Sequence, residues 1–110
     1  MNRYELFIGE DDQYYFNLVA GNHKVVLRSS EGYPKKASAL KGIESVRKHA
    51  SCDDNYQRKD SVDGEYYFVI KANNNETIGV SETYPEKPIR DQGIEAVKRI
   101  APHAKVEDRT

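Results

Sequence analysis

The sequence predicts a mixed architecture of strands and helices, built from two tandem copies of one module of about fifty residues. Each copy reads as a β-meander followed by one amphipathic helix. Three observations lead to this prediction. The segment at residues 30–50 recurs at 81–101, alternating apolar residues precede both segments, and apolar residues at helical spacing lie within them.

The duplication is the strongest signal in the chain. Residues 30–50 and 81–101 align without a gap, and ten of the 21 positions are identical. Further upstream, Tyr14–Phe16 matches Tyr66–Phe68 if the second copy lacks one residue, and the Asn-rich turn at residues 73–75 is where a deletion would be tolerated. We expect the 110 residues to form one domain, with repeat one at about 1–53 and repeat two at about 54–110.

Strands are predicted wherever apolar residues alternate along the chain. In the first copy Tyr14, Phe16 and Leu18 form one face, and Tyr66, Phe68 and Ile70 repeat it in the second copy. Turn-rich residues then lead into a second strand and close a hairpin in each copy. The strand-like stretches before the two helices are residues 4–8, 14–19, 25–27, 66–70 and 77–80.

The period changes to that of a helix from Lys36 onward. The apolar positions that share one helix side are Ala39, Ile43, Val46 and Ala50 in the first copy, and Ile94, Val97 and Ala101 in the second. Pro88 suits a first turn and places the second helix at about 88–100. Gly42 and Gly93 are mid-helix, where Gly costs about 1 kcal/mol relative to Ala, so we expect close packing of helix on sheet there. Strand-like stretches follow each helix near residues 55–59 and 104–107.

Composition narrows the class of protein. The 17 basic and 18 acidic side chains nearly cancel, which argues against a general electrostatic grip on nucleic acid or anionic lipid. The single Cys52 cannot form an internal disulfide, and no run of eighteen apolar residues is present. We therefore expect a cytoplasmic protein with no membrane segment.

Metal and catalytic motifs are not found. The histidines and Cys52 have no ligand spacing, and the acidic run Glu10-Asp11-Asp12 lacks the pattern of a calcium loop. No nucleophile, base or phosphate-binding glycine loop forms a recognisable set. We expect no catalytic residue, no metal and no cofactor.

Two polar segments precede the helices and invite two interpretations. Ser30, Glu31 and Tyr33 of the first copy recur as Ser81, Glu82 and Tyr84. In the structural interpretation, which we favour, Ser and Glu satisfy backbone donors and Tyr covers the edge of the core. In the other, the repeated segments build a catalytic or small-molecule site.

The second face of the sheet offers a different surface. If Phe16 and Phe68 point at the helices, then Tyr15 and Tyr67 point away and are displayed on the opposite face. Exposed aromatic rings can stack on single-stranded nucleic acid, with nearby basic residues on phosphates, but the neutral net charge weighs against this. A peptide, a protein partner or a second copy of the chain fits the same face.

The segments Ser29–Tyr33, Lys36 and Gly42–Val46 resemble the signature of the YegP-like family of small, mostly bacterial proteins. The resemblance covers nearly the whole chain. It implies an α+β fold in which two repeats of three-stranded meander, helix and final strand form a single antiparallel sheet, pseudo-twofold symmetric, with exchange of the C-terminal strands and both helices on one face. It implies no activity. The second copy departs from the signature at Thr83, where the first has Gly32, so a site built on that loop would exist in only one copy.

Two functions therefore stay open. The favoured one is a non-catalytic binding or interaction module that uses the sheet face with Tyr15 and Tyr67. The alternative is a small enzyme or small-molecule-binding protein that uses the repeated Ser-Glu-x-Tyr segments. We also expect a monomer, because the second copy already supplies the partner that a single module would need.

Overall fold

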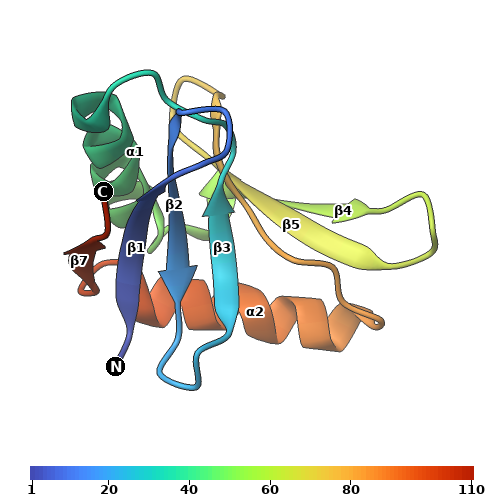
Figure 1. The fold of residues 1–110 in the computed structure, drawn as a ribbon. Coiled ribbons are helices and arrows are strands. Elements are labelled where there is room, and N and C mark those ends of the chain that lie inside the picture. Colours follow the sequence, from blue (N-terminus) through green and yellow to red (C-terminus); the bar gives the residue numbers. More distant parts are fainter.

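A computed structural model shows one sheet of seven strands with both helices packed on the same face (Figure 1). The first copy contributes β1 (Arg3–Ile8), β2 (Tyr14–Val19), β3 (Val25–Ser29) and α1 (Lys36–His49). The second contributes β4 (Tyr56–Asp60), β5 (Tyr66–Lys71), β6 (Thr77–Val80), α2 (Lys87–Ile100) and the final strand β7 (Lys105–Asp108). A short 3₁₀ turn at Asp53–Asn55 joins α1 to β4. The α+β fold with two meanders is confirmed.

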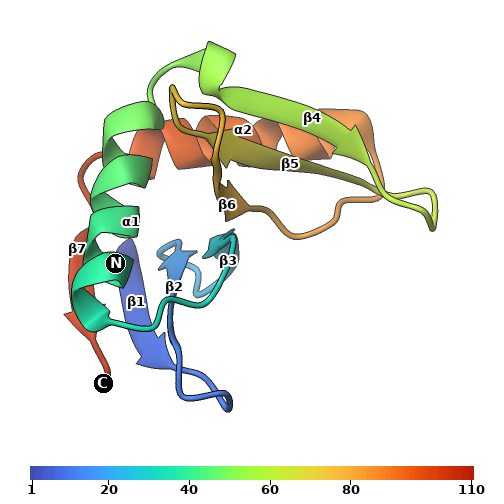
Figure 2. The same cartoon turned by 90° about the horizontal axis from the view of Figure 1, so that it is seen from above.

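The two halves of the sheet meet at a pseudo-twofold axis between β3 and β6. The strand order is β4-β5-β6-β3-β2-β1-β7, so the last strand of each meander lies at the centre. There Arg28 pairs with Val80, and these two are equivalent positions because they are separated by the same 52 residues as Phe16 and Phe68. Strands β4 and β5 lie at a steep angle to β1, β2 and β3, which Figure 2 shows from above. The two copies within one chain thus pair as two subunits of a symmetric dimer would.

The missing residue of the second copy lies in the loop before α2, and the prediction that placed it at residues 73–75 is wrong. Both hairpin turns have the same form, with a positive φ of 68° at His23 and 70° at Asn75. The spacing of 52 extends as far as Ser29 and Ser81, whose hydroxyls accept the backbone N–H of Phe16 and Phe68 respectively. Ser81 is therefore the counterpart of Ser29.

The mid-helix glycines allow the tyrosine before each helix to pack against the helix backbone. Tyr33 stacks on Phe16 at 6.4 Å between ring centroids, and a Cβ on Gly42 would lie 2.8 Å from its hydroxyl oxygen. In the second copy a Cβ on Gly93 would lie 2.6 Å from the hydroxyl of Tyr84. The expected close packing at these glycines is confirmed.

The core accepts only one large side chain at the axis. Leu27 and Gly79 are equivalent positions, 52 residues apart, and a Cβ on Gly79 would lie 2.7 Å from a methyl carbon of Leu27. Leu27 is fully buried in the single hydrophobic cluster that both copies share. A leucine in both copies would place two side chains in the volume of one.

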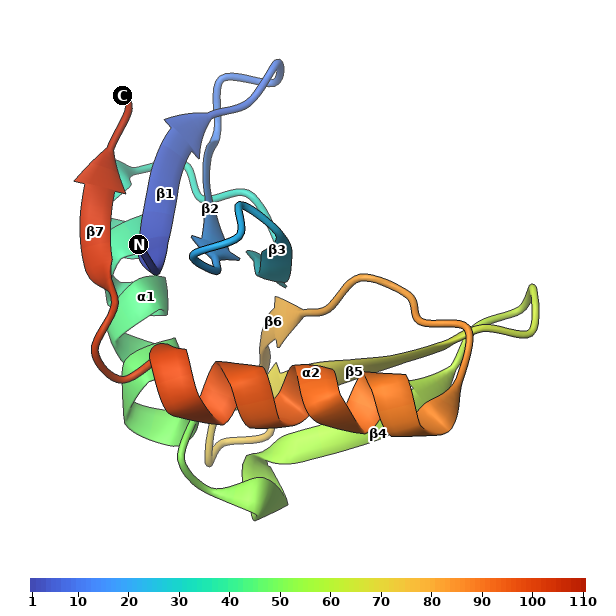
Figure 3. The ribbon, with the colours of Figure 1, turned by 90° about the horizontal axis from the view of Figure 1, so that it is seen from below.

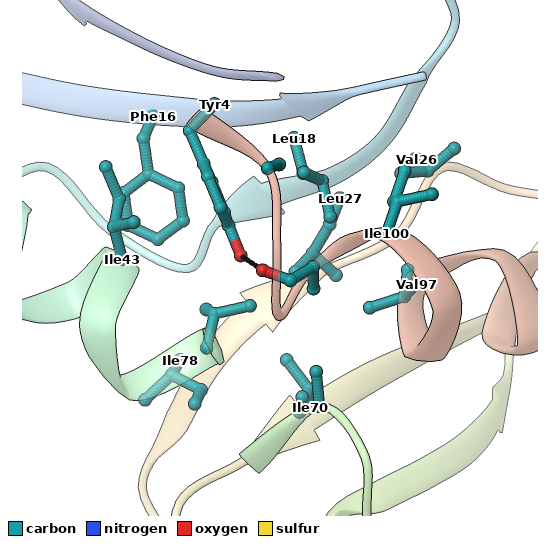
Figure 4. Packing of buried hydrophobic residues seen from close by; sticks show 14 of the residues in the cluster. Tyr4, Phe16, Leu18, Val26, Leu27, Ile43, Ile70, Ile78, Val97 and Ile100 are labelled. Atoms are coloured by element: carbon teal, nitrogen blue, oxygen red, sulfur yellow. Dashed lines mark hydrogen bonds between the residues drawn. The ribbon is translucent and has the colours of Figure 1, made fainter. Parts of the chain in front are cut away.

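Two buried tyrosines tie each meander to the helix of the other copy. The hydroxyl of Tyr4 donates to the carbonyl of Ala101 at the end of α2 (Figure 4), and the hydroxyl of Tyr56 donates to the carbonyl of Ala50 at the end of α1, both at 2.7 Å. Burial raises the pKa of both phenols. Arg47 lies over the ring of Tyr4. These bonds satisfy carbonyls that a helix end leaves without a partner.

The sheet is not antiparallel throughout, which corrects the sequence expectation. Strand β7 pairs with β1 in parallel (Figure 3), whereas every other pairing is antiparallel. The cause is the position at which α2 ends. Its last carbonyls lie beside Tyr4, near the start of β1, so the short connection enters the sheet there and runs in the direction of β1. The strand after each helix thus joins the half of the sheet that the other copy builds.

Replacing Tyr4 with Phe is expected to destabilise the fold by about 1–3 kcal/mol, because the carbonyl of Ala101 is then buried without a donor. Urea unfolding followed by circular dichroism measures the change. Tyr14→Phe is the matched control, since its half-buried hydroxyl makes no hydrogen bond within the chain. Equal stability of the Tyr4→Phe and Tyr14→Phe variants would contradict the proposed tie.

The crowding at the axis predicts a strong coupling between two substitutions. Gly79→Ala alone should cost about 1–3 kcal/mol through overpacking. It should cost at least about 1 kcal/mol less in a Leu27→Ala background, because that change removes two of the three atoms nearest the added methyl group and leaves only a methyl carbon of Ile70 at 2.9 Å. Gly21→Ala is the control, because the nearest atom to its added Cβ is 3.6 Å away. Additive effects of Gly79→Ala and Leu27→Ala in urea unfolding would rule out the shared volume.

Candidate functional site: the outer face of the sheet

The largest cavity lies on the sheet face turned away from the helices, the side of β1, β2 and β3 that faces the reader in Figure 1. Its volume is about 680 Å³. Such a volume falls within the range of small-ligand sites. The residues that border it from the strands are Phe7, Tyr15, Asn17, Arg28, Ser29 and Val80, and the adjoining loops add Gly9, Glu10, Asp11 and Ser30.

Tyr15 is held in place at the centre of this wall. Its ring stacks on Phe7, the neighbour across β1 and β2, at 5.9 Å and an interplanar angle of 20°. Glycines bound the ring on two sides, since a Cβ on Gly9 or Gly32 would lie 2.6 Å or 2.7 Å from its atoms. Its hydroxyl donates to Asp11 at 2.6 Å. The aromatic wall is therefore fixed before any ligand binds.

The hydrogen bond between Tyr15 and Asp11 sets the charge at this end of the cavity. It lowers the pKa of the Asp11 carboxyl and raises the pKa of the Tyr15 phenol. The backbone N–H of Gln13 donates to the same carboxylate. At neutral pH Asp11 is thus ionised and Tyr15 is neutral, and the neighbouring Glu10 adds a second carboxylate without a hydrogen bond of its own.

Arg28 brings the opposite charge to the other end, at the pseudo-twofold axis. Its Nε lies 3.1 Å from Glu82, its side chain is 55% exposed, and it donates no hydrogen bond of good geometry within the chain. Asn17 faces Arg28 across β2 and β3, and its side-chain amide is also without a hydrogen bond. The cavity therefore offers an anionic end, an aromatic wall and a cationic end with open donors.

Tyr67 lies on the same face, but its surroundings differ from those of Tyr15. It pairs across the strands with Lys59 rather than with an aromatic residue, and it borders no cavity. Ser61 and Thr83 stand where the first copy has Gly9 and Gly32. The two tyrosines are related by topology, while the site around Tyr15 exists in one copy only.

The second face of the sheet is not open along its whole length. Val19 and Val69 are only 2% and 5% exposed, although neither belongs to the main hydrophobic cluster. Val69 lies between Gln57 and Val80 in the middle of a cross-strand row, and Val19 lies at a β-bulge that bends its strand. Among the other residues of this face, Arg28 is exposed, and Tyr15 and Tyr67 are both half-buried.

The repeated Ser-Glu-x-Tyr residues make mainly structural contacts. Ser30 donates to the carbonyl of Thr77 in β6, and Ser81 donates to the carbonyl of Glu82. Burial raises the pKa of Tyr33 and Tyr84, whose rings stack on core phenylalanines. Glu31 is exposed to solvent. No cavity is bordered by all three side chains of either segment.

The remaining polar side chains singled out in the sequence do not form a site. His49 contacts the carbonyl of Ser45 through Nδ1 and accepts the backbone N–H of Asn73 through Nε2, so it joins α1 to the hairpin of the other copy. Cys52 is exposed and unpaired. No group of three or more His, Cys, Asp or Glu side chains is arranged to hold a metal ion. Neither helix is long and apolar enough to cross a membrane.

Sequence reasoning missed Phe7 and the pairing of Arg28 with Glu82 as parts of this surface. The register that brings Phe7 beside Tyr15 was available from the hairpin alone. The place of Arg28 at the axis could not be predicted from the hairpin, because it depends on how β3 pairs with β6.

The chain matches a known protein family over most of its length. The family model described as "Domain of unknown function (DUF1508)" matches residues 10–57 and again residues 61–108. The chain belongs to this family. A UPF0339 protein of Bordetella pertussis is 46% identical over 110 residues, which cover 100% of this chain and 98% of that protein. A UPF0339 protein of Pseudomonas aeruginosa is 39% identical over 106 residues, which cover 96% of each chain.

Two solved structures show the same fold. The solution structure of the protein of unknown function yegP from E. coli has a TM-score of 0.93 and 38% identity, covering 99% of this chain and 93% of that one. A UPF0339 protein from Shewanella oneidensis has a TM-score of 0.90 and 36% identity, covering 97% and 90%. The resemblance to the YegP-like family is confirmed, and these relatives carry no stated activity.

Proposed function

We propose that this DUF1508 protein is a non-catalytic binding module whose ligand surface is the outer face of the sheet around Tyr15. The observation that carries the proposal is the fixed ring of Tyr15, wedged between Gly9 and Gly32 at the centre of the largest cavity. An ordered aromatic surface loses little side-chain entropy when a ligand covers it. Tyr67 lies at the periphery of the same face.

A peptide or protein segment suits this surface better than a nucleic acid does. The carboxylates of Glu10 and Asp11 border the cavity, and they would repel the phosphates of a base stacked on Tyr15. Arg28 is the only basic side chain in the cavity wall, so the wall has no second cation for the further phosphates of a nucleic-acid strand. A peptide carries main-chain amides and charges of both signs, and the wall likewise has two carboxylates and one guanidinium.

The alternative, a small enzyme or small-molecule site on the Ser-Glu-x-Tyr segments, has weaker support. Tyr33 and Tyr84 are committed to packing against Gly42 and Gly93, and the serines are bonded to backbone. Neither segment has a base placed beside a nucleophile.

Loss of the Tyr15 ring is expected to remove bound material that wild-type protein captures from native lysate. Eluted peptides and proteins are identified by mass spectrometry, and nucleic acid by sequencing with and without nuclease. Tyr67→Ala is the matched control, since it removes a tyrosine from the same face but not from the cavity. Identical capture by wild type and Tyr15→Ala would overturn the proposal.

We infer that the chain is a cytoplasmic monomer. The surface that would join two single modules is already used between β3 and β6, and both edge strands carry charged residues that discourage pairing, among them Lys59, Lys105 and Glu107. The exposed, unpaired Cys52 fits a reducing compartment.

Multi-angle light scattering is expected to give a mass near 12.6 kDa, that of one chain. The mass should stay the same over a wide range of protein concentrations, because no partner copy is needed to complete the core. A mass of two chains would contradict this expectation.

A further inference from the structure

We propose that the cavity around Tyr15 binds a short peptide of about two to four residues whose two termini are both free. This inference rests on the proposed binding function and names its ligand class. It is carried by the order of groups along the cavity, in which two carboxylates, an aromatic wall and a guanidinium follow one another. A zwitterion with an apolar side chain presents the complementary order.

The carboxylate end of the ligand is assigned to Arg28. A guanidinium recognises a carboxylate through parallel N–H donors, and Arg28 donates no hydrogen bond of good geometry to its ion-pair partner Glu82. The amide of Asn17 lies directly across the strands from Arg28. These groups together match both oxygens of a carboxylate.

The ammonium end is assigned to the turn between β1 and β2. Asp11 is oriented there by the donors Tyr15 and Gln13, and its lowered pKa keeps it ionised. Glu10 is exposed beside it and has no ion-pair partner. A single ammonium group can donate to both carboxylates while a side chain rests on the ring of Tyr15.

The sheet register sets the length of the ligand. Tyr15 and Asn17 are two residues apart on one strand face, which separates them by about 6.6 Å, and the acidic turn lies beyond Tyr15 on the other side. An extended peptide advances about 3.3–3.6 Å per residue, so two to four residues connect the two charged ends. A cavity of about 680 Å³ accommodates a ligand of that size.

The second copy provides an internal negative control. At the positions equivalent to Arg28, Asn17 and Phe7 it has Val80, Val69 and Lys59. A surface without the guanidinium, the amide and the second aromatic ring cannot hold the same zwitterion. The ligand should therefore bind once per chain.

The test compares free and capped forms of one probe, a tripeptide of alanine, phenylalanine and alanine. Binding to the full chain is followed by calorimetry and by ¹H–¹⁵N NMR shifts of residues in β2 and β3. The free tripeptide is expected to bind at one site, and acetylation of its amino terminus or amidation of its carboxyl terminus should each weaken binding by about tenfold, the loss typical of one charge-assisted contact.

Two variants assign the ends. Arg28→Met should abolish the difference between the carboxylate and amide forms while preserving sensitivity to acetylation, and Glu10→Gln should reduce sensitivity to acetylation alone. Lys24→Met is the matched control, because Lys24 is an exposed cation outside this cavity. Unfolding in urea confirms that each variant is folded.

The outcomes separate this inference from the proposed function. Equal binding of free and capped tripeptides, or shifts unchanged by Arg28→Met, would overturn the assignment of termini while leaving a Tyr15-dependent surface intact. If none of the free, acetylated and amidated tripeptides shifts the signals of β2 and β3, while capture from lysate still depends on Tyr15, the assignment of termini is also overturned and the proposed function is kept. If wild type and Tyr15→Ala also capture the same material from lysate, the proposed binding function is overturned as well.

Discussion

The reciprocal hydrogen bonds of Tyr4 and Tyr56 are the constraint on which the arrangement of the two copies depends. Each phenol crosses from one meander to the terminal carbonyl of the helix that the other copy supplies. Because both groups are buried, neither can exchange its partner for water, and a shift of one copy relative to the other would break both bonds at once. The bonds therefore set the register between sheet and helices, and the central pairing of β3 with β6 follows from it.

The two copies differ at a few positions, and these differences produce the packing at the axis and the site on the outer face. At the axis, one leucine opposite one glycine fills a volume that two equal side chains would overfill or leave empty. On the outer face, the glycines that bound Tyr15 and the arginine beside it have no counterparts in the second copy. The second copy instead buries Val69 in the corresponding row. One copy thus keeps a surface with open donors while the other contributes mainly to packing.

Much of the fold follows from local patterns. The alternation in β2 and β5, the helical period after Lys36 and the proline in the first turn of α2 depend on neighbouring residues, and their elements were predicted to within a residue or two. The candidate site was predicted in part, since Tyr15 follows from strand alternation alone. Basic residues near this face were expected, but the ion pair of Arg28 with Glu82 at the axis was not, because it depends on the pairing of β3 with β6. The direction of β7 was missed for the same reason, as it depends on where α2 ends in space.

The parallel pairing of β7 with β1 brings the two ends of the chain together, and the bond from Tyr4 to Ala101 spans 97 positions of the sequence. Contacts of such long range form late in folding, because the whole intervening loop must close first. An emerging nascent chain therefore holds β1 with one unpaired edge and Tyr4 without its acceptor until the last dozen or so residues leave the ribosome, whereas Tyr56 follows Ala50 by only six residues. The half of the sheet that the first copy builds therefore takes its edge strand from the end of the chain, and a chain that lacked β7 would leave one edge of β1 unpaired.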